Sequence, residues 1–212
     1  MAGKLIVCGI NKKIGFKQIL SEVNFSISPG ELMVLKGSNG VGKTTLLNII
    51  AGTAKMSSGK IFFNDRFNNI SNKIGLLAHQ PMVYETMTAK ENMLFFGRMY
   101  AVKDNEKINS LLDRTGLYFF RNEPVHTYSR GMKQRLALAL MLLHDPEILL
   151  YDEPFTGLDT SGQLLVKEII KEMISIRKYQ IVSTHNITMF SDFKYRVLSM
   201  EKGKLVEEKR LT

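Results

Sequence analysis

A glycine-rich segment at residues 37–44 carries the clearest chemical signal in the sequence. It reads Gly-Ser-Asn-Gly-Val-Gly-Lys-Thr and satisfies the pattern G-x-x-x-x-G-K-[ST], between a continuous apolar run and a helical pattern. Glycines let backbone N–H groups wrap around phosphate oxygens, and the start of a helix adds positive potential. Lys43 would reach the β- and γ-phosphates, and the Thr44 hydroxyl would hold Mg²⁺. The segment predicts binding of a nucleoside triphosphate, without separating a small-molecule kinase from a GTPase or a motor.

Two carboxylates follow an apolar run farther along the chain. Residues 148–151 are Ile-Leu-Leu-Tyr, and Asp152 and Glu153 come directly after them. At the tip of a buried strand, Asp152 suits an outer-shell contact to Mg²⁺, and Glu153 can orient and polarise an attacking water. An acidic surface turn is the alternative, and the apolar run before the pair disfavours it.

A serine and a glycine mark the start of a third informative segment. Ser129 precedes an amphipathic helical pattern as its N-cap, and Gly131 allows close approach to the backbone of the first turn. Such a helix start can bind an anion. One chain cannot easily bring both this segment and residues 37–44 to one γ-phosphate, whereas two chains facing head to tail can.

Asp159 and His185 complete the polar residues of interest. Asp159 is a natural N-cap for the helix that follows, and His185 comes just after an apolar run at 181–183. A histidine at that sheet edge could touch a γ-phosphate. Taken alone, a surface histidine is the more frequent explanation.

The framework for these residues is an α/β core with a helical insertion. Apolar runs and alternations predict strands at 23–27, 32–35, 60–63, 74–78, 148–151, 181–183, 197–200 and 205–206. Capping residues and 3.6-residue periodicity predict helices that end near Gly52, cover 88–100 and 104–115, begin at Ser129 and cover 160–177. We expect one domain over residues 1–212, with the core at 1–81 and 144–212 and a helical subdomain at about 82–143.

The composition fits a soluble chain that reaches a membrane only through a partner. The longest apolar run, at 136–143, has eight residues, whereas a membrane-spanning helix needs about 20. The N-terminus lacks the apolar stretch of a secretory signal. Cys8 is the single cysteine, which fits a reducing compartment, and we expect it to be a small buried thiol.

The order and spacing of the motifs resemble the nucleotide-binding domain of ATP-binding-cassette (ABC) proteins over essentially the whole chain. The matching set is the glycine-rich loop, Gln80 after the predicted strand at 74–78, the segment 129–132, Asp152 with Glu153, the segment 157–159 and His185. Each piece alone is modest, and the ordered set is specific. The resemblance implies the ABC ATPase fold, a P-loop NTPase (RecA-like) core with an antiparallel β subdomain and an inserted α-helical subdomain.

The resemblance also implies a mechanism, with ATP and Mg²⁺ as cofactors. Two cassettes would close on two ATP molecules, each held between residues 37–45 of one subunit and 129–132 of the other. The implied catalytic residues are Lys43, Gln80, Glu153 and His185. The implied nucleotide-binding residues are Gly37, Ser38, Asn39, Gly40, Val41, Gly42, Lys43, Thr44, Thr45, Gln80, Ser129, Gly131, Met132 and Asp159, and the implied metal contacts are Thr44, Gln80 and Asp152.

Individual roles follow from the same resemblance. Glu153 would be the catalytic base, His185 would contact the γ-phosphate, and Gln80 would sense the metal and the water at the hinge to the helical block. Asp159 would communicate across a head-to-tail homodimer. A cytoplasmic helix of an integral membrane permease subunit, lying near Gln80, would receive the motion.

Two departures from the family pattern stand out. The usual Leu-Ser-Gly-Gly-Gln is Tyr-Ser-Arg-Gly-Met here, so Ser129 and Gly131 are kept while Arg130 and Met132 differ. The aromatic residue that usually stacks on adenine is replaced by Ile14, and Phe16 is the nearest aromatic substitute.

The chain resembles most the ATP-binding subunit of the haem exporter for cytochrome c biogenesis, through residues 78–81, 129–132 and 144–146. We expect it at the cytoplasmic face of the inner membrane. Exporters of lipids, antibiotics or polysaccharides share these motifs and are the alternative. The net charge of +9 would suit nucleic acid, but non-transport relatives usually carry two cassettes or a coiled coil, so no direct nucleic-acid contact is expected. A small-molecule kinase would leave the segments 129–132 and 157–159 unexplained.

Overall fold

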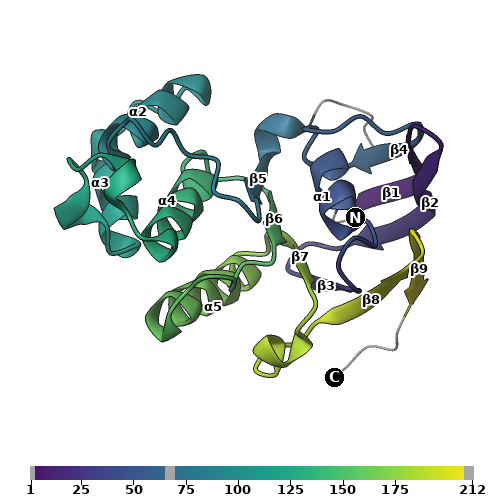
Figure 1. The fold of residues 1–212 in the computed structure, drawn as a ribbon. Helices are drawn as coiled ribbons and strands as arrows, with labels where there is room; N and C mark the ends of the chain where they lie inside the picture. Colours follow the sequence, from purple (N-terminus) through teal and green to yellow (C-terminus); the bar gives the residue numbers. More distant parts are fainter. Residues whose placement is uncertain (1–2, 65–69, 208–212) are drawn as a thin grey trace.

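The computed structural model describes residues 3–64 and 70–207. These residues form two sheets and a group of helices (Figure 1). The three-stranded antiparallel sheet has the order β2-β1-β4, with β1 (Leu5–Ile14), β2 (Lys17–Ile27) and β4 (Ser58–Phe63). The six-stranded sheet has the order β5-β6-β7-β3-β8-β9, with β5 (Ile74–Leu77), β6 (Ile148–Asp152), β7 (Tyr179–Thr184), β3 (Leu32–Lys36), β8 (Arg196–Glu201) and β9 (Lys204–Glu207).

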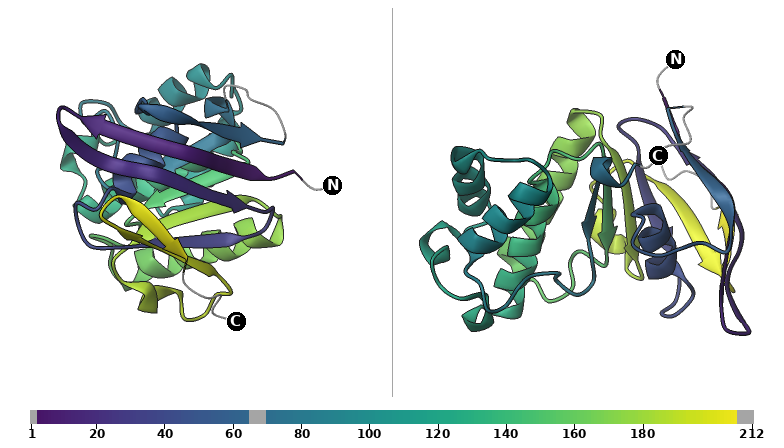
Figure 2. Two further views of the ribbon diagram at one scale, coloured as in Figure 1. Left: turned by 90° about the vertical axis from the view of Figure 1, so that its right-hand side faces the viewer. Right: turned by 90° about the horizontal axis from the view of Figure 1, so that it is seen from above.

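Five α-helices accompany the sheets, together with short 3₁₀ segments. The α-helices are α1 (Lys43–Ile50), α2 (Ala89–Met99), α3 (Asn105–Arg114), α4 (Arg130–Leu142) and α5 (Thr160–Ser175). The 3₁₀ segments are η1 (Ser71–Lys73), η2 (Tyr118–Phe120), η3 (Val125–Thr127) and η4 (Ile187–Phe190). Figure 2 shows α1 between the two sheets, whereas α2, α3 and α4 gather on the opposite side of the six-stranded sheet.

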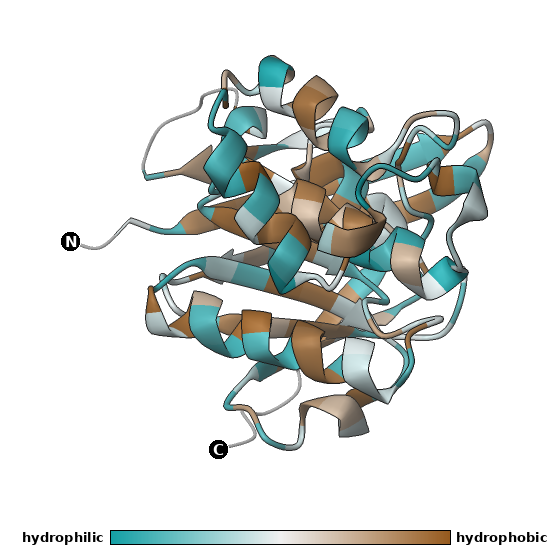
Figure 3. Cartoon of the chain, turned by 90° about the vertical axis from the view of Figure 1, so that its left-hand side faces the viewer, coloured by the Kyte–Doolittle hydropathy of each residue, from teal (hydrophilic) through white to brown (hydrophobic). Residues whose placement is uncertain are grey.

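The strands from β5 to β8 pair in parallel, and both faces of this sheet are buried. In β3, Met33 and Leu35 pack toward α1 and the antiparallel sheet, whereas Leu32 and Val34 pack toward the helices on the other face. A parallel sheet covered on both faces explains why the strand sequences are continuous apolar runs. Figure 3 shows the mixture of apolar and polar residues along the helices on one side of the molecule.

Most predicted elements are confirmed, but the first strand was missed. Its inward residues, Leu5 and Val7, alternate normally, and the next one is Ile10. The pairing register shifts between Val7 and Ile10, and Gly9 lies in between with φ 61°. This bulge breaks the period of two on which strand prediction depends.

The same strand corrects the expectation for Cys8. Its side chain is exposed rather than buried. Because successive strand residues point to opposite faces, the burial of Leu5 and Val7 turns Cys8 toward solvent. The preference of cysteine for protein interiors is overridden here by its position in the strand.

The helix starts follow the capping residues. Thr88 and Glu91 form the reciprocal capping box predicted for α2, Asp104 caps α3, and Ser129 accepts a 3.2 Å hydrogen bond from the Met132 N–H at the start of α4. The predicted end of α5 was two residues too late, because the helix ends at Ser175 and Arg177 adopts a φ of 61°.

A buried asparagine fastens α2 to the segment before it. Asn92 is fully buried, accepts a 2.8 Å hydrogen bond from the Tyr84 N–H, and donates to the carbonyls of Tyr84 (3.0 Å) and Thr88 (2.9 Å). Removing this amide leaves the part-buried N–H and carbonyl of Tyr84 without these partners and opens a void at a fully buried position.

We therefore expect Asn92→Ala to lower the free energy of unfolding by about 2–4 kcal/mol, measured by urea denaturation. Asn122→Ala changes an exposed asparagine near the same helices and should stay within about 0.5 kcal/mol. Equal effects of the two variants would show that the hydrogen bonds of Asn92 contribute nothing specific.

Candidate active site

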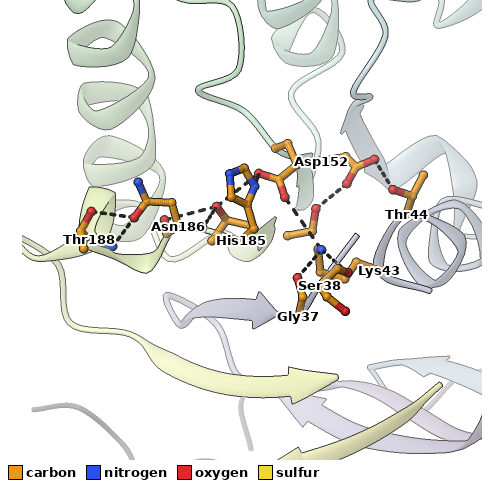
Figure 4. Close-up of polar contacts among 11 residues, drawn as sticks. Gly37, Ser38, Lys43, Thr44, Asp152, His185, Asn186 and Thr188 are labelled. Atoms are coloured by element: carbon orange, nitrogen blue, oxygen red, sulfur yellow. Dashed lines mark hydrogen bonds and ion pairs between the residues drawn. The ribbon is translucent and has the colours of Figure 1, made fainter. Parts of the chain in front are cut away.

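Three neighbouring parallel strands end at the same edge of the large sheet and deliver the polar residues there. β3 leads into the glycine-rich loop and α1, β6 ends at Asp152, and β7 ends at Thr184. Ligands of open α/β sheets bind outside the carboxyl ends of the strands. Figure 4 shows residues from these three strand ends side by side, with Lys43 on the carbonyls of Gly37 and Ser38 and with Asp152 and His185 nearby.

The glycine-rich loop needs its glycines for space and for backbone conformation. A Cβ at Gly37 would lie 2.8 Å from the Met200 carbonyl oxygen, and Gly42 adopts a φ of 115°. The N-cap of α1 is Gly42, so no side chain caps the first N–H groups of the helix. Those donors are available to an anion.

Lys43 is buried and lies across the loop. Its Nζ donates to the carbonyls of Gly37 (2.7 Å) and Ser38 (3.1 Å) and lies 3.9 Å from Oε1 of Glu153. The side chain is 6% exposed, so the ammonium is fixed by these contacts rather than by solvent. A positive charge is therefore held where the loop would wrap a phosphate.

Thr44 and Asp152 supply neighbouring oxygen atoms. The Thr44 hydroxyl donates to Oδ2 of Asp152 at 2.8 Å, and the Ser183 hydroxyl donates to Oδ1. No group of three or more His, Cys, Asp or Glu side chains within residues 3–64 and 70–207 could hold a metal ion by itself. One hydroxyl and one carboxylate fit Mg²⁺, which keeps several waters and takes its remaining oxygens from substrate phosphates.

Glu153 is the acidic residue best placed to accept a proton. Its Oε2 lies 3.0 Å from Nδ1 of His185 and accepts from the Thr184 hydroxyl at 3.3 Å. Its Oε1 is buried and has no hydrogen-bond partner within the described parts of the chain. The backbone is left-handed at this residue, with φ 51°, which is uncommon for a residue with a side chain. Such local strain concentrates at functional sites.

A hollow of about 340 Å³ joins these residues. Its lining consists of Ile19, Asn39, Gly40, Gly42, Lys43, Thr44, Thr45, His79, Asp152 and Glu153. The loop and both carboxylates thus face one cavity. His185 is exposed and touches it through Glu153.

Two lining residues were missed in the sequence. His79 lines the hollow, whereas its neighbour Gln80, the predicted sensor, is exposed and does not. Ile19 lines it from β2, in a stretch that carried no chemical signal. Nothing in the residue types distinguished His79 from Gln80.

The candidates for the contact with adenine lie at the tip of the hairpin that β1 and β2 form. Ile14 and Phe16 lie at the turn between β1 and β2, and both side chains are largely exposed to solvent. Neither lines the hollow. Ile19 is the large apolar side chain that lines the hollow from β2.

The segment 129–132 and Asp159 do not line this hollow either. The segment 129–132 lies instead against the turn before α5, since a Cβ at Gly131 would be 3.4 Å from the Gly157 carbonyl oxygen, and Asp159 is paired with Arg135 farther along α4. The glycine-rich loop and the segment 129–132, both predicted to bind an anion, therefore do not share this hollow within one chain.

The fold and this arrangement define a P-loop ATPase of the ABC class. The chain belongs to the ABC transporter family, because the family model described as "ABC transporter" matches residues 20–156. The chain is the ATP-binding subunit of an ABC transporter and contains an ABC ATPase domain.

Three relatives of this chain are ATP-binding proteins of bacterial ABC transporters. The chain is 35% identical to the ABC transporter ATP-binding protein YdbJ of Bacillus subtilis, over 94% of this chain and 67% of that protein. It is 33% identical to the lantibiotic transport ATP-binding protein SrtF of Streptococcus pyogenes, over 97% of this chain and 90% of that protein. It is 32% identical to the bacitracin transport ATP-binding protein BcrA of Bacillus licheniformis, over 94% and 67%.

Solved structures agree with the fold. An ATP-binding subunit of an ABC transporter superposes with a TM-score of 0.88 at 23% identity, covering 98% of this chain and 90% of the other. The dimeric, post-hydrolysis ATP-binding cassette MJ0796, bound to ADP and phosphate, superposes with a TM-score of 0.81 at 26% identity, covering 98% and 99%.

Proposed function

We propose that this chain is the motor subunit of an exporter, hydrolysing Mg-ATP in a head-to-tail homodimer at the cytoplasmic face of the membrane. The observation that carries the proposal is the shared hollow of Lys43, Thr44, Asp152 and Glu153, with the segment 129–132 outside it. A complete site needs that segment from a second copy. The dimeric state of the MJ0796 cassette supports this assembly.

The proposed chemistry assigns one task to each side chain. Lys43 exchanges its loop carbonyls for the β- and γ-phosphate oxygens and neutralises their charge. Thr44 and Asp152 would hold Mg²⁺, which supplies charge neutralisation on the phosphates when bound. Glu153 orients a water through Oε1 and accepts its proton, while His185 and Thr184 hold Oε2.

The second subunit contributes its α4 start. Ser129, Gly131 and Met132 would meet the γ-phosphate of the ATP bound by the first subunit, with the remaining loop residues of 37–45 around the other phosphates. Asp159 would lie close to the facing loop. Gln80 would sense the metal and the water from the segment after β5, where its neighbour His79 already lines the hollow.

A second cavity has a lining that could receive a helix of the membrane partner. It measures about 310 Å³ and lies between the end of α1, β5, α2 and α4. Met82, Phe96, Tyr100, Leu140 and His144 contribute to its lining, and Met82 and Tyr100 are 58% and 39% exposed. A short amphipathic helix of a permease would bury these apolar groups. Residues 82–143 would then move with that helix as a subdomain.

Separate membrane subunits are part of this proposal. No helix in the described ranges 3–64 and 70–207 is long and apolar enough to cross a membrane. The relatives named for lantibiotic and bacitracin transport favour a peptide-antibiotic or drug-like cargo. Haem, suggested by residues 78–81, 129–132 and 144–146, has no support among these relatives.

The proposal is tested by partner capture from the native cells. Tagged Glu153→Gln protein, trapped with ATP, should co-purify with multi-span membrane proteins from solubilised membranes. Sensitivity of the cells to peptide antibiotics after deletion, or loss of cytochrome c, then separates the two cargo classes. Ribosomes or DNA without a membrane protein would overturn the transport role and leave the ATPase chemistry standing.

A surface charge in the second cavity should abolish this capture. We expect Met82→Glu to reduce recovery of the membrane partner at least tenfold, because a carboxylate would be buried against the apolar face of the amphipathic helix. ATP hydrolysis by the isolated subunit should stay within twofold. Leu164→Glu is the matched control, since Leu164 is equally exposed, at 56%, but lies on α5. Equal recovery for both variants would move the docking surface elsewhere.

A further inference from the structure

The arginine that departs from the family pattern has an intramolecular contact. The side chain of Arg130 lies directly over Gly157, and a Cβ at Gly157 would meet its Nε at 2.8 Å, its Cδ at 2.9 Å and its Cγ at 3.3 Å. Gly157 has a φ of 77°, so glycine is required there for conformation as well as for space. The guanidinium takes part in no hydrogen bond or ion pair within the described parts of the chain. The contact is therefore a packing contact of the aliphatic stem, through Cγ and Cδ, and of Nε, rather than a hydrogen bond or an ion pair.

A second arginine of α4 binds the same turn one helical turn later. Nη2 of Arg135 lies 2.9 Å from Oδ1 of Asp159 and 2.6 Å from the hydroxyl of Ser161. Oδ1 of Asp159 also accepts the Gly162 N–H at 2.8 Å, as the cap of α5. The Gly162 N–H and the Arg135 guanidinium hold the pKa of Asp159 below its usual range, so this contact stays charged at neutral pH.

The turn held by these arginines is the direct continuation of the catalytic carboxylate. The Thr156 N–H donates to the Glu153 carbonyl at 3.1 Å, and the Leu158 N–H donates to the Phe155 carbonyl at 3.3 Å. Only three residues separate Glu153 from Gly157. A displacement of the start of α4 would therefore be transmitted through Gly157 to the backbone next to Glu153.

We propose that Arg130 and Arg135 form a clasp between α4 and the 157–162 turn, so that the Ser129 segment and Glu153 of one chain move as a unit. This inference rests on the proposed head-to-tail dimer. In that dimer, Ser129 of a chain meets one ATP and Glu153 of the same chain serves the other. The clasp would be the intramolecular path by which occupation of one site sets the geometry of the second, and Arg130 is a positioning residue.

The quantity to measure is the Hill coefficient of ATP hydrolysis by the full chain, which can approach 2 for two coupled sites. Arg130→Ala removes the stem over Gly157 and should lower the coefficient toward 1. Arg130→Met keeps an apolar stem without the charge and should retain the wild-type coefficient, with KM within about twofold. Arg135→Ala, which breaks the other half of the clasp, should also lower it.

Each outcome decides a separate point. If the wild type and Arg130→Ala have the same Hill coefficient above 1, the clasp is overturned. A loss in Arg130→Met equal to that in Arg130→Ala would assign the function to the guanidinium charge, and so would overturn positioning by the stem. A wild type with a coefficient of 1, while ATP is still hydrolysed, would overturn the coupling between sites, and size-exclusion chromatography of ATP-bound Glu153→Gln would then show separately whether the dimer forms. Unfolding temperatures of the two Arg130 variants and the wild type should match, because Arg130 is exposed.

Discussion

Replacing Glu153 with Gln is expected to lower kcat for ATP hydrolysis by about 10²–10⁴-fold, the usual contribution of a positioned general base. The amide keeps the shape of the side chain and its neighbours His185 and Thr184 but cannot accept a proton from water. ATP should still bind, because Lys43 and the loop are unchanged. The protein should accumulate as an ATP-bound dimer in size-exclusion chromatography.

Glu147→Gln is the matched control for this variant. Glu147 immediately precedes β6, at the strand end opposite to Glu153, and forms an exposed ion pair with Lys73. Exposed pairs of this kind contribute about 0–1 kcal/mol, so its kcat should be that of the wild type. Near-normal turnover in Glu153→Gln would exclude Glu153 as the base.

Replacing Lys43 with Ala is expected to weaken ATP binding by about 10²-fold or more. The ammonium would make at least two charge-assisted hydrogen bonds to phosphate oxygens, worth about 1.5–3 kcal/mol each. Every 1.4 kcal/mol changes Kd about tenfold. Isothermal titration calorimetry with ATP measures the loss directly.

Lys178→Ala provides the comparison for Lys43→Ala. Lys178 is also largely covered, with 15% of its side chain exposed, and is paired to Asp145, but it precedes β7 at the opposite edge of the sheet. ATP affinity should be unaffected by this change. Retention of full affinity in Lys43→Ala would contradict the assignment of residues 37–44 as the phosphate loop.

The sequence was most informative where one physical rule determines position. Parallel strands end at a common edge, so the loop after residues 32–35 and the carboxylates after 148–151 had to meet, as Lys43 and Glu153 do. Capping residues worked equally well, since Thr88, Asp104, Ser129 and Asp159 each bind the backbone of the helix that they begin.

The features that escaped prediction depend on contacts between distant segments or on local irregularity. The bulge at Gly9 hid β1, and without that strand the outward position of Cys8 could not be predicted. The side-chain directions of His79 and Gln80 after β5 could not be ranked, because both follow the strand and both are polar. The packing of Arg130 on Gly157 joins residues 27 positions apart and leaves no periodic trace in the sequence.

The exposed Cys8 has a practical consequence for watching this ATPase at work. It is the single cysteine of the chain, and it faces solvent on β1, turned away from the core that packs on α1. A maleimide or nitroxide would attach there without any engineered substitution. In the proposed dimer the two labels would form one symmetric pair, and the distance between them would report opening and closing as nucleotide is added and consumed.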